Sequence, residues 1–187
     1  LTAFVMAPGL QVELVADGAL LREPVAMQFS PDGRLWVLES APIEGAAAAG
    51  EPRVDGSIAV LEDTDADGRM DRRTVFTTDL SAPRGMVLLG SGALALDGAD
   101  YWFFRDRDGD LVSDEKQKVA TDFSEAGSRS QGPNGLFLAL DNWIYGAGST
   151  TRLRYYGSGG FARDFTDRRS GRGVAQDEVG RLHHLGE

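Results

Sequence analysis

Two short stretches of the sequence carry aspartates at a spacing that suits a metal ion. The first has carboxylates at positions 1, 3, 5 and 9 of a loop with glycine at position 6, namely Asp63, Asp65, Asp67 and Asp71. This is the oxygen-rich pattern of an EF-hand-type calcium loop, in which the backbone carbonyl of position 7, here Arg69, is a further ligand. Thr74 stands at position 12, where an EF-hand has a bidentate glutamate. We therefore expect a hairpin-loop site rather than a true EF-hand.

The second stretch repeats this spacing 43 residues later, with Asp106, Asp108, Asp110 and Asp114. Val112 offers the carbonyl of position 7. Its glycine stands at position 4 (Gly109) and Leu111 takes position 6, so we expect the turn to differ in detail. One such loop could be merely an acidic turn, but its recurrence favours two Ca²⁺ sites, because four carboxylates within nine residues repel one another unless a cation neutralises them. The affinity is expected in the weak extracellular range, on the order of 10⁻⁵ to 10⁻³ M.

The elements that position these loops are indicated by an internal repeat. Four segments align without a gap, and in each a small residue opens an apolar run that leads to a turn and a second apolar run: Ala26–Trp36, Gly85–Ala95, Gly135–Tyr145 and Gly173–His183. One column of the alignment holds residues that tolerate positive φ, as a tight hairpin turn requires: Gly33, Gly92, Asn142 and Gly180. The pattern predicts four hairpins with equivalent turns.

A second strand pair is predicted after each of the first three hairpins. The pairs are 57–62 with 74–77, 100–105 with 118–123, and 151–156 with 161–165. Four strands at a period of about 40–50 residues form a propeller blade. The sequence therefore predicts an all-β fold and a partial β-propeller, a single domain over 1–187. Its expected parts are an N-terminal strand 10–16 and blades at about 25–80, 84–123 and 134–165, with half of a fourth at 172–187.

Composition narrows the class of function. The formal charge of −10 and the pI near 4.7 argue against a nucleic-acid partner, which needs a basic face. The sequence has no cysteine, which excludes disulfides and covalent attachment of a c-type haem. No apolar stretch approaches the length of a membrane span. A chain that begins at Leu1 is expected either for a processed, exported protein or for a trimmed one.

Few other residues suggest chemistry. His183 and His184 are neighbours on the last predicted strand, so their side chains point to opposite faces and cannot share one metal. We expect packing and solvation for them, or, as the alternative, a base or quinone contact at the propeller axis. Arg84, Asn134 and Arg172 share one column of the repeat and could line a central channel. No set of catalytic residues is recognisable.

The sequence resembles one bacterial family along nearly its whole length. The matching stretches are Leu10–Ala16, Pro24–Met27, Asp32–Val37, Leu61–Asp65, Asn134–Leu136, Leu140–Gly146 and Gln176–Leu182. They resemble the propeller domain of exported "membrane-bound dehydrogenase" proteins of planctomycete-type bacteria. That family is related to glucose and sorbosone dehydrogenases that use pyrroloquinoline quinone (PQQ). Its members usually have a His-Arg pair before the position of Asn134, where this sequence has Gln131-Gly132.

Two functions follow as hypotheses. The first is a non-catalytic, calcium-stabilised scaffold outside the cytoplasm that joins other protein chains of a larger assembly, which would cover the open sheet edges of an unclosed propeller. The second, implied by the resemblance, is a fragment of a PQQ-type sugar or alcohol dehydrogenase whose catalytic part lies beyond residue 187.

Overall fold

The computed structural model describes residues 5–40, 56–121, 134–166 and 173–184. Within these ranges the chain forms fourteen strands and no helix. Blade 1 consists of β1 (Pro24–Phe29), β2 (Leu35–Glu39), β3 (Gly56–Glu62) and β4 (Arg72–Leu80). Blade 2 consists of β5 (Pro83–Leu89), β6 (Gly92–Asp97), β7 (Asp100–Arg105) and β8 (Glu115–Thr121). Blade 3 consists of β9 (Asn134–Leu138), β10 (Ile144–Ala147), β11 (Thr151–Tyr155) and β12 (Phe161–Phe165). A half blade follows, with β13 (Val174–Gln176) and β14 (Leu182–His184).

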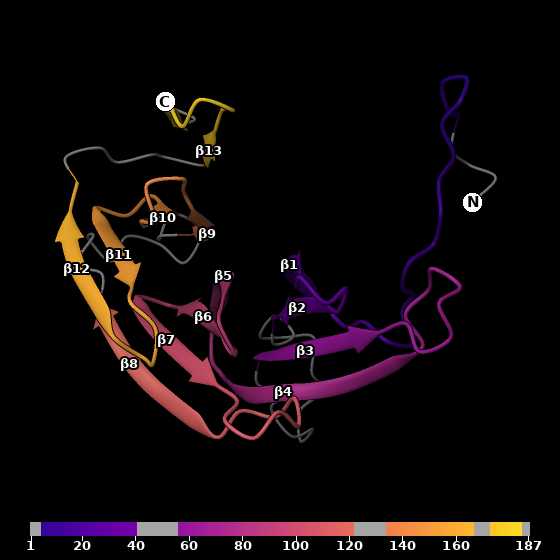
Figure 1. Cartoon of the computed structure of the whole chain (residues 1–187), viewed down its shortest axis with the longest axis horizontal. Helices are drawn as coiled ribbons and strands as arrows, with labels where there is room; N and C mark the ends of the chain where they lie inside the picture. Colours follow the sequence, from indigo (N-terminus) through magenta and orange to yellow (C-terminus); the bar gives the residue numbers. More distant parts are fainter. Residues whose placement is uncertain (1–4, 41–55, 122–133, 167–172, 185–187) are drawn as a thin grey trace, which may run out of the picture.

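Each four-stranded sheet is an antiparallel meander in which every strand pairs with the next one along the chain. The blades follow one another along an arc (Figure 1), with β1, β5 and β9 side by side on its concave side and β4, β8 and β12 on its outside. This arrangement confirms the predicted all-β, partial propeller fold. The predicted second strand pairs of the three blades are confirmed as well, except that residues 122 and 123 of the second pair lie outside the described residues.

The hydrophobic core lies between the blades. One cluster joins blade 1 to blade 2 through side chains such as Trp36, Ile58 and Phe76 on one side and Met86 and Phe104 on the other. A second cluster joins blade 2 to blade 3. The strands β2, β3 and β6 are buried almost throughout, because each of them is covered on both faces. The stacking of blades therefore holds the third and fourth strands of each blade in place. In blades 1 and 2 it also holds the acidic loop between those two strands.

The hairpin turns confirm three members of the predicted turn column. Gly33, Asn142 and Gly180 have φ of 85°, 63° and 85°, and the three turns share one hydrogen-bond pattern. Gly92 is an exception. It opens β6, and the turn of that hairpin consists of Gly90 and Ser91, one residue shorter than the others. The gapless alignment is therefore wrong by one residue in blade 2. A Cβ on Gly92 would lie 2.0 Å from the carbonyl oxygen of Phe104, so this glycine allows a close approach of backbones instead.

The N-terminal segment corrects another expectation. Residues 10–16 carry no strand in the structure, because no described strand pairs with them. The segment instead packs on the face of blade 1 that looks away from blade 2. There Val15, Ala16, Leu20 and Leu21 contact a cluster that includes Leu35, Val37, Leu61 and Met70.

Candidate metal centre

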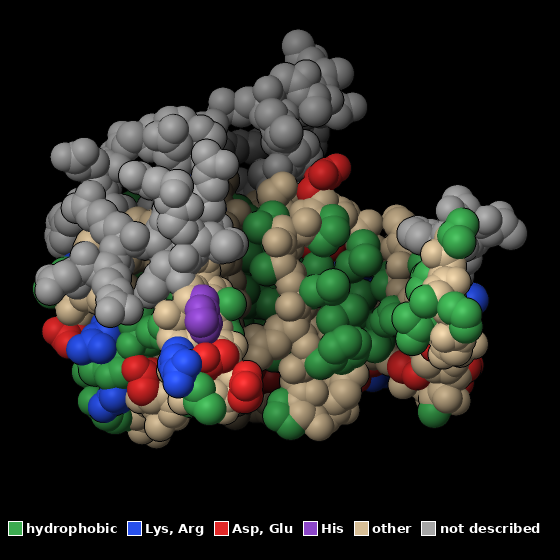
Figure 2. Space-filling view, turned by 90° about the horizontal axis from the view of Figure 1, so that it is seen from above, with side chains coloured by type: hydrophobic (Ala, Val, Ile, Leu, Met, Phe, Trp, Pro, Cys, Tyr) green, Lys and Arg blue, Asp and Glu red, His purple; other side chains and the backbone are tan. Residues whose placement is uncertain are grey.

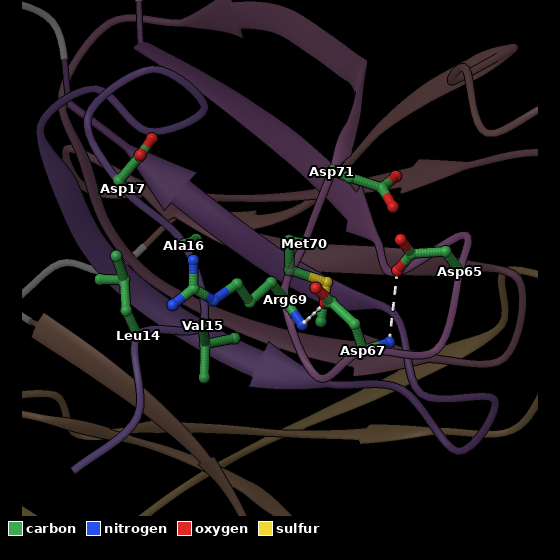
Figure 3. A pocket seen from close by; sticks show the side chains of 9 residues that line it. All are labelled: Leu14, Val15, Ala16, Asp17, Asp65, Asp67, Arg69, Met70 and Asp71. Atoms are coloured by element: carbon green, nitrogen blue, oxygen red, sulfur yellow. Dashed lines mark hydrogen bonds between the residues drawn. The ribbon is translucent and has the colours of Figure 1, made fainter.

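The first acidic loop joins β3 to β4 on the rim of blade 1. Oxygen atoms of Asp63, Asp65 and Asp71 lie within 4.8 Å of one another, close enough to share a single cation. Asp63 is half-buried and the other two are exposed. A shallow hollow separates these carboxylates from the N-terminal segment (Figure 3), with Leu14 to Asp17 on one side and Asp65 to Asp71 on the other. The loop is thus open to ions from solvent.

The second loop joins β7 to β8 on the rim of blade 2 and gathers the equivalent residues. Oxygen atoms of Asp106, Asp108 and Asp114 also lie within 4.8 Å of one another. Asp106 is buried, with 7% of its surface exposed, whereas Asp108 and Asp114 are exposed. A second, more open hollow lies beside these residues.

The two loops share left-handed backbone at the same two positions, although their hydrogen bonds to the carboxylate of position 1 differ in detail, as expected. Both have positive φ at positions 4 and 6: Ala66 (62°) and Gly68 (89°) in the first loop, Gly109 (86°) and Leu111 (67°) in the second. Each loop thus places one glycine and one residue with a side chain in the left-handed region, in opposite order. The exchange of glycine positions hid this equivalence in the sequence.

Hydrogen bonds confirm the equivalence at several positions. Gly68 N donates to Asp63 Oδ2 at 2.9 Å, and Leu111 N donates to Asp106 Oδ2 at 3.0 Å. At position 9, the carboxylates of Asp71 and Asp114 accept from the backbone nitrogens of position 2 at 3.0 and 2.7 Å. Both loops therefore fold around the carboxylates of positions 1 and 9.

The aspartates at position 5 differ from the rest of the predicted set. Asp67 and Asp110 belong to neither carboxylate group. Each accepts a 2.8 Å hydrogen bond from the backbone nitrogen of position 7, that is, from Arg69 and Val112. Three carboxylates per loop are thus brought together. Ligation by position 5 and by the carbonyls of Arg69 and Val112 remains a prediction.

The hydrogen bonds also favour the ionised form of Asp63. The backbone N–H of Gly68, with further help from the backbone of Ala66 and Asp67, holds the pKa of Asp63 below its usual value despite some desolvation. The carboxylate is therefore charged near neutral pH, as a hard divalent cation requires of its ligands.

Each loop is closed at its base by an ion pair across the hairpin, with the charges exchanged between blades. In blade 1, Glu62 on β3 lies opposite Arg72 on β4, with 2.7 Å between their charged atoms. In blade 2, Arg105 on β7 lies opposite Glu115 on β8, at 2.6 Å. The sequence analysis missed these pairs, because only the strand register brings positions ten residues apart together.

The other residues considered from the sequence do not form a site among the described residues. Nε2 of His183 lies 3.2 Å from Asp177, within the half blade. Arg84 and Asn134 begin innermost strands, as expected, whereas Arg172 and the Gln131-Gly132 pair lie outside the described residues. In the parts of the chain that the structure describes, no helix is long and apolar enough to cross a membrane.

Comparison with known proteins identifies a family model that matches most of the chain. A family model described as "Domain of unknown function (DUF7133)" matches residues 1–170. No curated protein matches the chain.

Three solved structures with a similar fold have titles that name enzymes. The holo form of the pyranose dehydrogenase PQQ domain from Coprinopsis cinerea has a TM-score of 0.57 and 13% identity, over 88% of this chain and 43% of that one. A luciferin-regenerating enzyme has a TM-score of 0.52 and 14% identity, over 83% and 49%. A putative gluconolactonase has a TM-score of 0.50 and 18% identity, over 84% and 53%. At these identities the likeness concerns the fold alone. The chain spans about half the length of each of these structures.

Proposed function

We propose that this chain, which belongs to the DUF7133 family, is a calcium-stabilised part of a β-propeller that acts outside the cytoplasm as a scaffold for other protein chains. The proposal rests on one observation. Two consecutive blades carry, at the same place, loops with the same backbone conformation, and each loop gathers three carboxylates within 4.8 Å. A single acidic turn is common on protein surfaces, but the same ligand geometry in two blades supports a common ligand.

The donor chemistry favours calcium. Carboxylate oxygens are hard ligands, and Ca²⁺ accepts six to eight oxygens in flexible geometry, with carbonyls and water completing the shell. Neither loop gathers histidine or cysteine, the ligands that zinc prefers. Because the carboxylates are largely exposed, affinity is expected in the weak range, which suits a compartment with high free calcium. This is the support for a location outside the cytoplasm.

The scaffold role is supported by an apolar face that the described residues leave uncovered. On β1, Met27 and Phe29 are 74% and 57% exposed. Their equivalents in blade 2, Met86 and Leu88, pack against blade 1. Seen from above in Figure 2, hydrophobic side chains gather over blade 1 beside the N-terminal segment. A β-sheet of another chain fits such a face.

Isothermal titration of chelator-stripped protein tests the calcium sites. We expect two sites for the natural sequence, and one each for Asp63→Asn and Asp106→Asn, because either substitution removes a carboxylate from only one loop. Asp177→Asn, in the half blade, is the matched control and should retain two. Absence of calcium heat from the natural sequence contradicts the proposal.

A second candidate, part of a PQQ-dependent dehydrogenase, is favoured by the fold likeness to the PQQ domain. We assign no described residue to a quinone and derive no catalytic step. We expect no dye reduction with aldoses after addition of PQQ and Ca²⁺. Turnover above the background without PQQ would favour this candidate over the scaffold.

A further inference from the structure

Position 8 of each acidic loop is hydrogen-bonded to the structure that precedes the loop's own blade. In the second loop, Ser113 N donates to Phe76 O at 2.9 Å, and Phe76 lies on β4, the outermost strand of blade 1. In the first loop, the equivalent Met70 N donates to Val15 O at 2.8 Å. Relative to blade 1, Val15 thus holds the place that an outermost strand holds relative to blade 2.

Apolar side chains accompany both hydrogen bonds. Leu111 of the second loop packs against the cluster between blades 1 and 2. Met70 of the first loop is 9% exposed and packs in the cluster that contains Val15, Leu20 and Leu21. Each loop therefore supplies one backbone donor and one apolar side chain to the element before it. The aspartates themselves take no part in these contacts, which makes them evidence independent of the acidic clusters.

The contact of the N-terminal segment stops short of the concave side. Leu35 and Val37 of β2 are almost fully buried beneath it, whereas Phe29 and Met27, their cross-strand partners on β1, stay exposed. The N-terminal segment thus covers blade 1 as an outer strand of a preceding blade would, and it leaves the innermost strand β1 uncovered.

We infer that the two acidic loops are latches between neighbouring units: the second holds blade 2 on blade 1, and the first holds residues 14–21 on the open face of blade 1. The contact itself follows from the hydrogen bonds and packing, and its dependence on calcium rests on the proposed function. Calcium bound at positions 1, 3 and 9 stiffens the loop that presents position 8, so that ion binding and retention of the preceding element are coupled.

A second attachment of the N-terminal segment does not involve the loop. Arg22 N donates to Oε1 of Glu39 at 3.0 Å. Glu39 is 1% exposed and is also bound by Ser57 Oγ at 2.7 Å and Arg73 at 2.8 Å. Release of the latch should therefore expose Met70 N while Arg22 N remains protected.

Amide hydrogen exchange of the full chain, resolved by residue, tests the latch. Loss of one hydrogen bond corresponds to about five- to tenfold faster exchange. With saturating Ca²⁺, we expect Asp63→Asn to accelerate exchange at Met70 by this factor and to leave Ser113 and Arg22 unchanged. Asp106→Asn should do the converse, and Asp177→Asn should change none of them.

A variant that acts without the metal keeps the test decisive. Val15→Asp places a charge in the apolar contact and should accelerate exchange at Met70, with or without Ca²⁺, while Ser113 stays protected. Unchanged exchange at Met70 in Val15→Asp overturns the latch. If titration finds calcium bound but chelation alters neither Met70 nor Ser113, the coupling is wrong and the calcium sites stand. If no calcium binds, the proposed function fails, and Val15→Asp still decides the contact.

Discussion

Gly85 lies directly against Gly135, so closely that a Cβ on Gly85 would come within 2.8 Å of the carbonyl carbon of Gly135. The two glycines stand at the same position of the repeat, near the start of neighbouring innermost strands, β5 and β9. Backbone meets backbone at this point. The glycine that opens the second repeat is therefore explained by the close approach of blades 2 and 3 on the concave side.

Gly85→Ala should destabilise the protein by about 1–3 kcal/mol, because the new methyl group meets main-chain atoms that cannot move independently. Gly18→Ala is the matched control, since a Cβ there has no neighbour within 4 Å. Urea unfolding of the two variants measures the difference. Equal stability of Gly85→Ala and the natural sequence would contradict the close packing.

Met27 and Met86 offer a second comparison, because they are repeat equivalents with opposite exposure. Met86→Ser should cost about 2–5 kcal/mol, since Met86 is 5% exposed in the core between blades. Met27→Ser should change the free energy of unfolding by less than about 0.5 kcal/mol. A large loss in Met27→Ser would mean that the face around β1 is already covered in the isolated chain.

The exchanged glycines of the acidic loops predict opposite effects of one substitution. Ala66→Gly relieves a left-handed conformation of an alanine and should stabilise by up to about 1 kcal/mol. Leu111→Gly relieves the same strain but removes a side chain that packs between blades 1 and 2, so we expect a net loss of about 1–2 kcal/mol. Thermal unfolding in excess Ca²⁺ distinguishes the signs.

The pH dependence of stability should contain a contribution from Asp100. Burial works to raise the pKa of Asp100, but hydrogen bonds from Lys118 and Thr121 and the charge of Lys118 outweigh it and lower the pKa below its usual 3.8. A lowered folded-state pKa stabilises above the unfolded-state pKa, and this contribution is lost as pH falls through the folded-state value.

Asp100→Asn should accordingly be less stable than the natural sequence near pH 6, by about 0.2–1 kcal/mol because the pair is partly exposed. The difference should shrink below about pH 4, as Asp100 takes up a proton. Urea unfolding at both pH values measures it. A difference that persists unchanged to pH 2 would show that the carboxylate charge is not its cause.

The sequence predicted the blades well because each strand pair carries its own local signal. Apolar runs and turn residues such as Gly33 and Asn142 mark the hairpins without knowledge of the rest of the chain. Gly92 misled the alignment, because a glycine needed for close approach looks the same in sequence as a glycine needed in a turn. The metal loops were recognisable from aspartate spacing. Their shared backbone was not, because Ala66 and Leu111 adopt a conformation for which sequence favours glycine.

The contacts between units could not be predicted at all. The hydrogen bonds from Met70 N to Val15 O and from Ser113 N to Phe76 O join backbone atoms, which every residue type possesses. The strand expected at 10–16 was wrong for a related reason. An apolar stretch can pack as part of a β-sheet or against its face, and only the availability of a paired neighbour decides between the two.

The tryptophans give each blade its own fluorescent reporter. Trp36 of blade 1 is buried in an apolar cluster, Trp102 of blade 2 lies beneath the ammonium group of Lys116, and Trp143 of blade 3 lies against the guanidinium groups of Arg152 and Arg154. Because the three indoles have different surroundings, they should differ in emission and in accessibility to quenchers. Variants that retain one tryptophan at a time would then show whether the blades unfold together or in sequence along the arc.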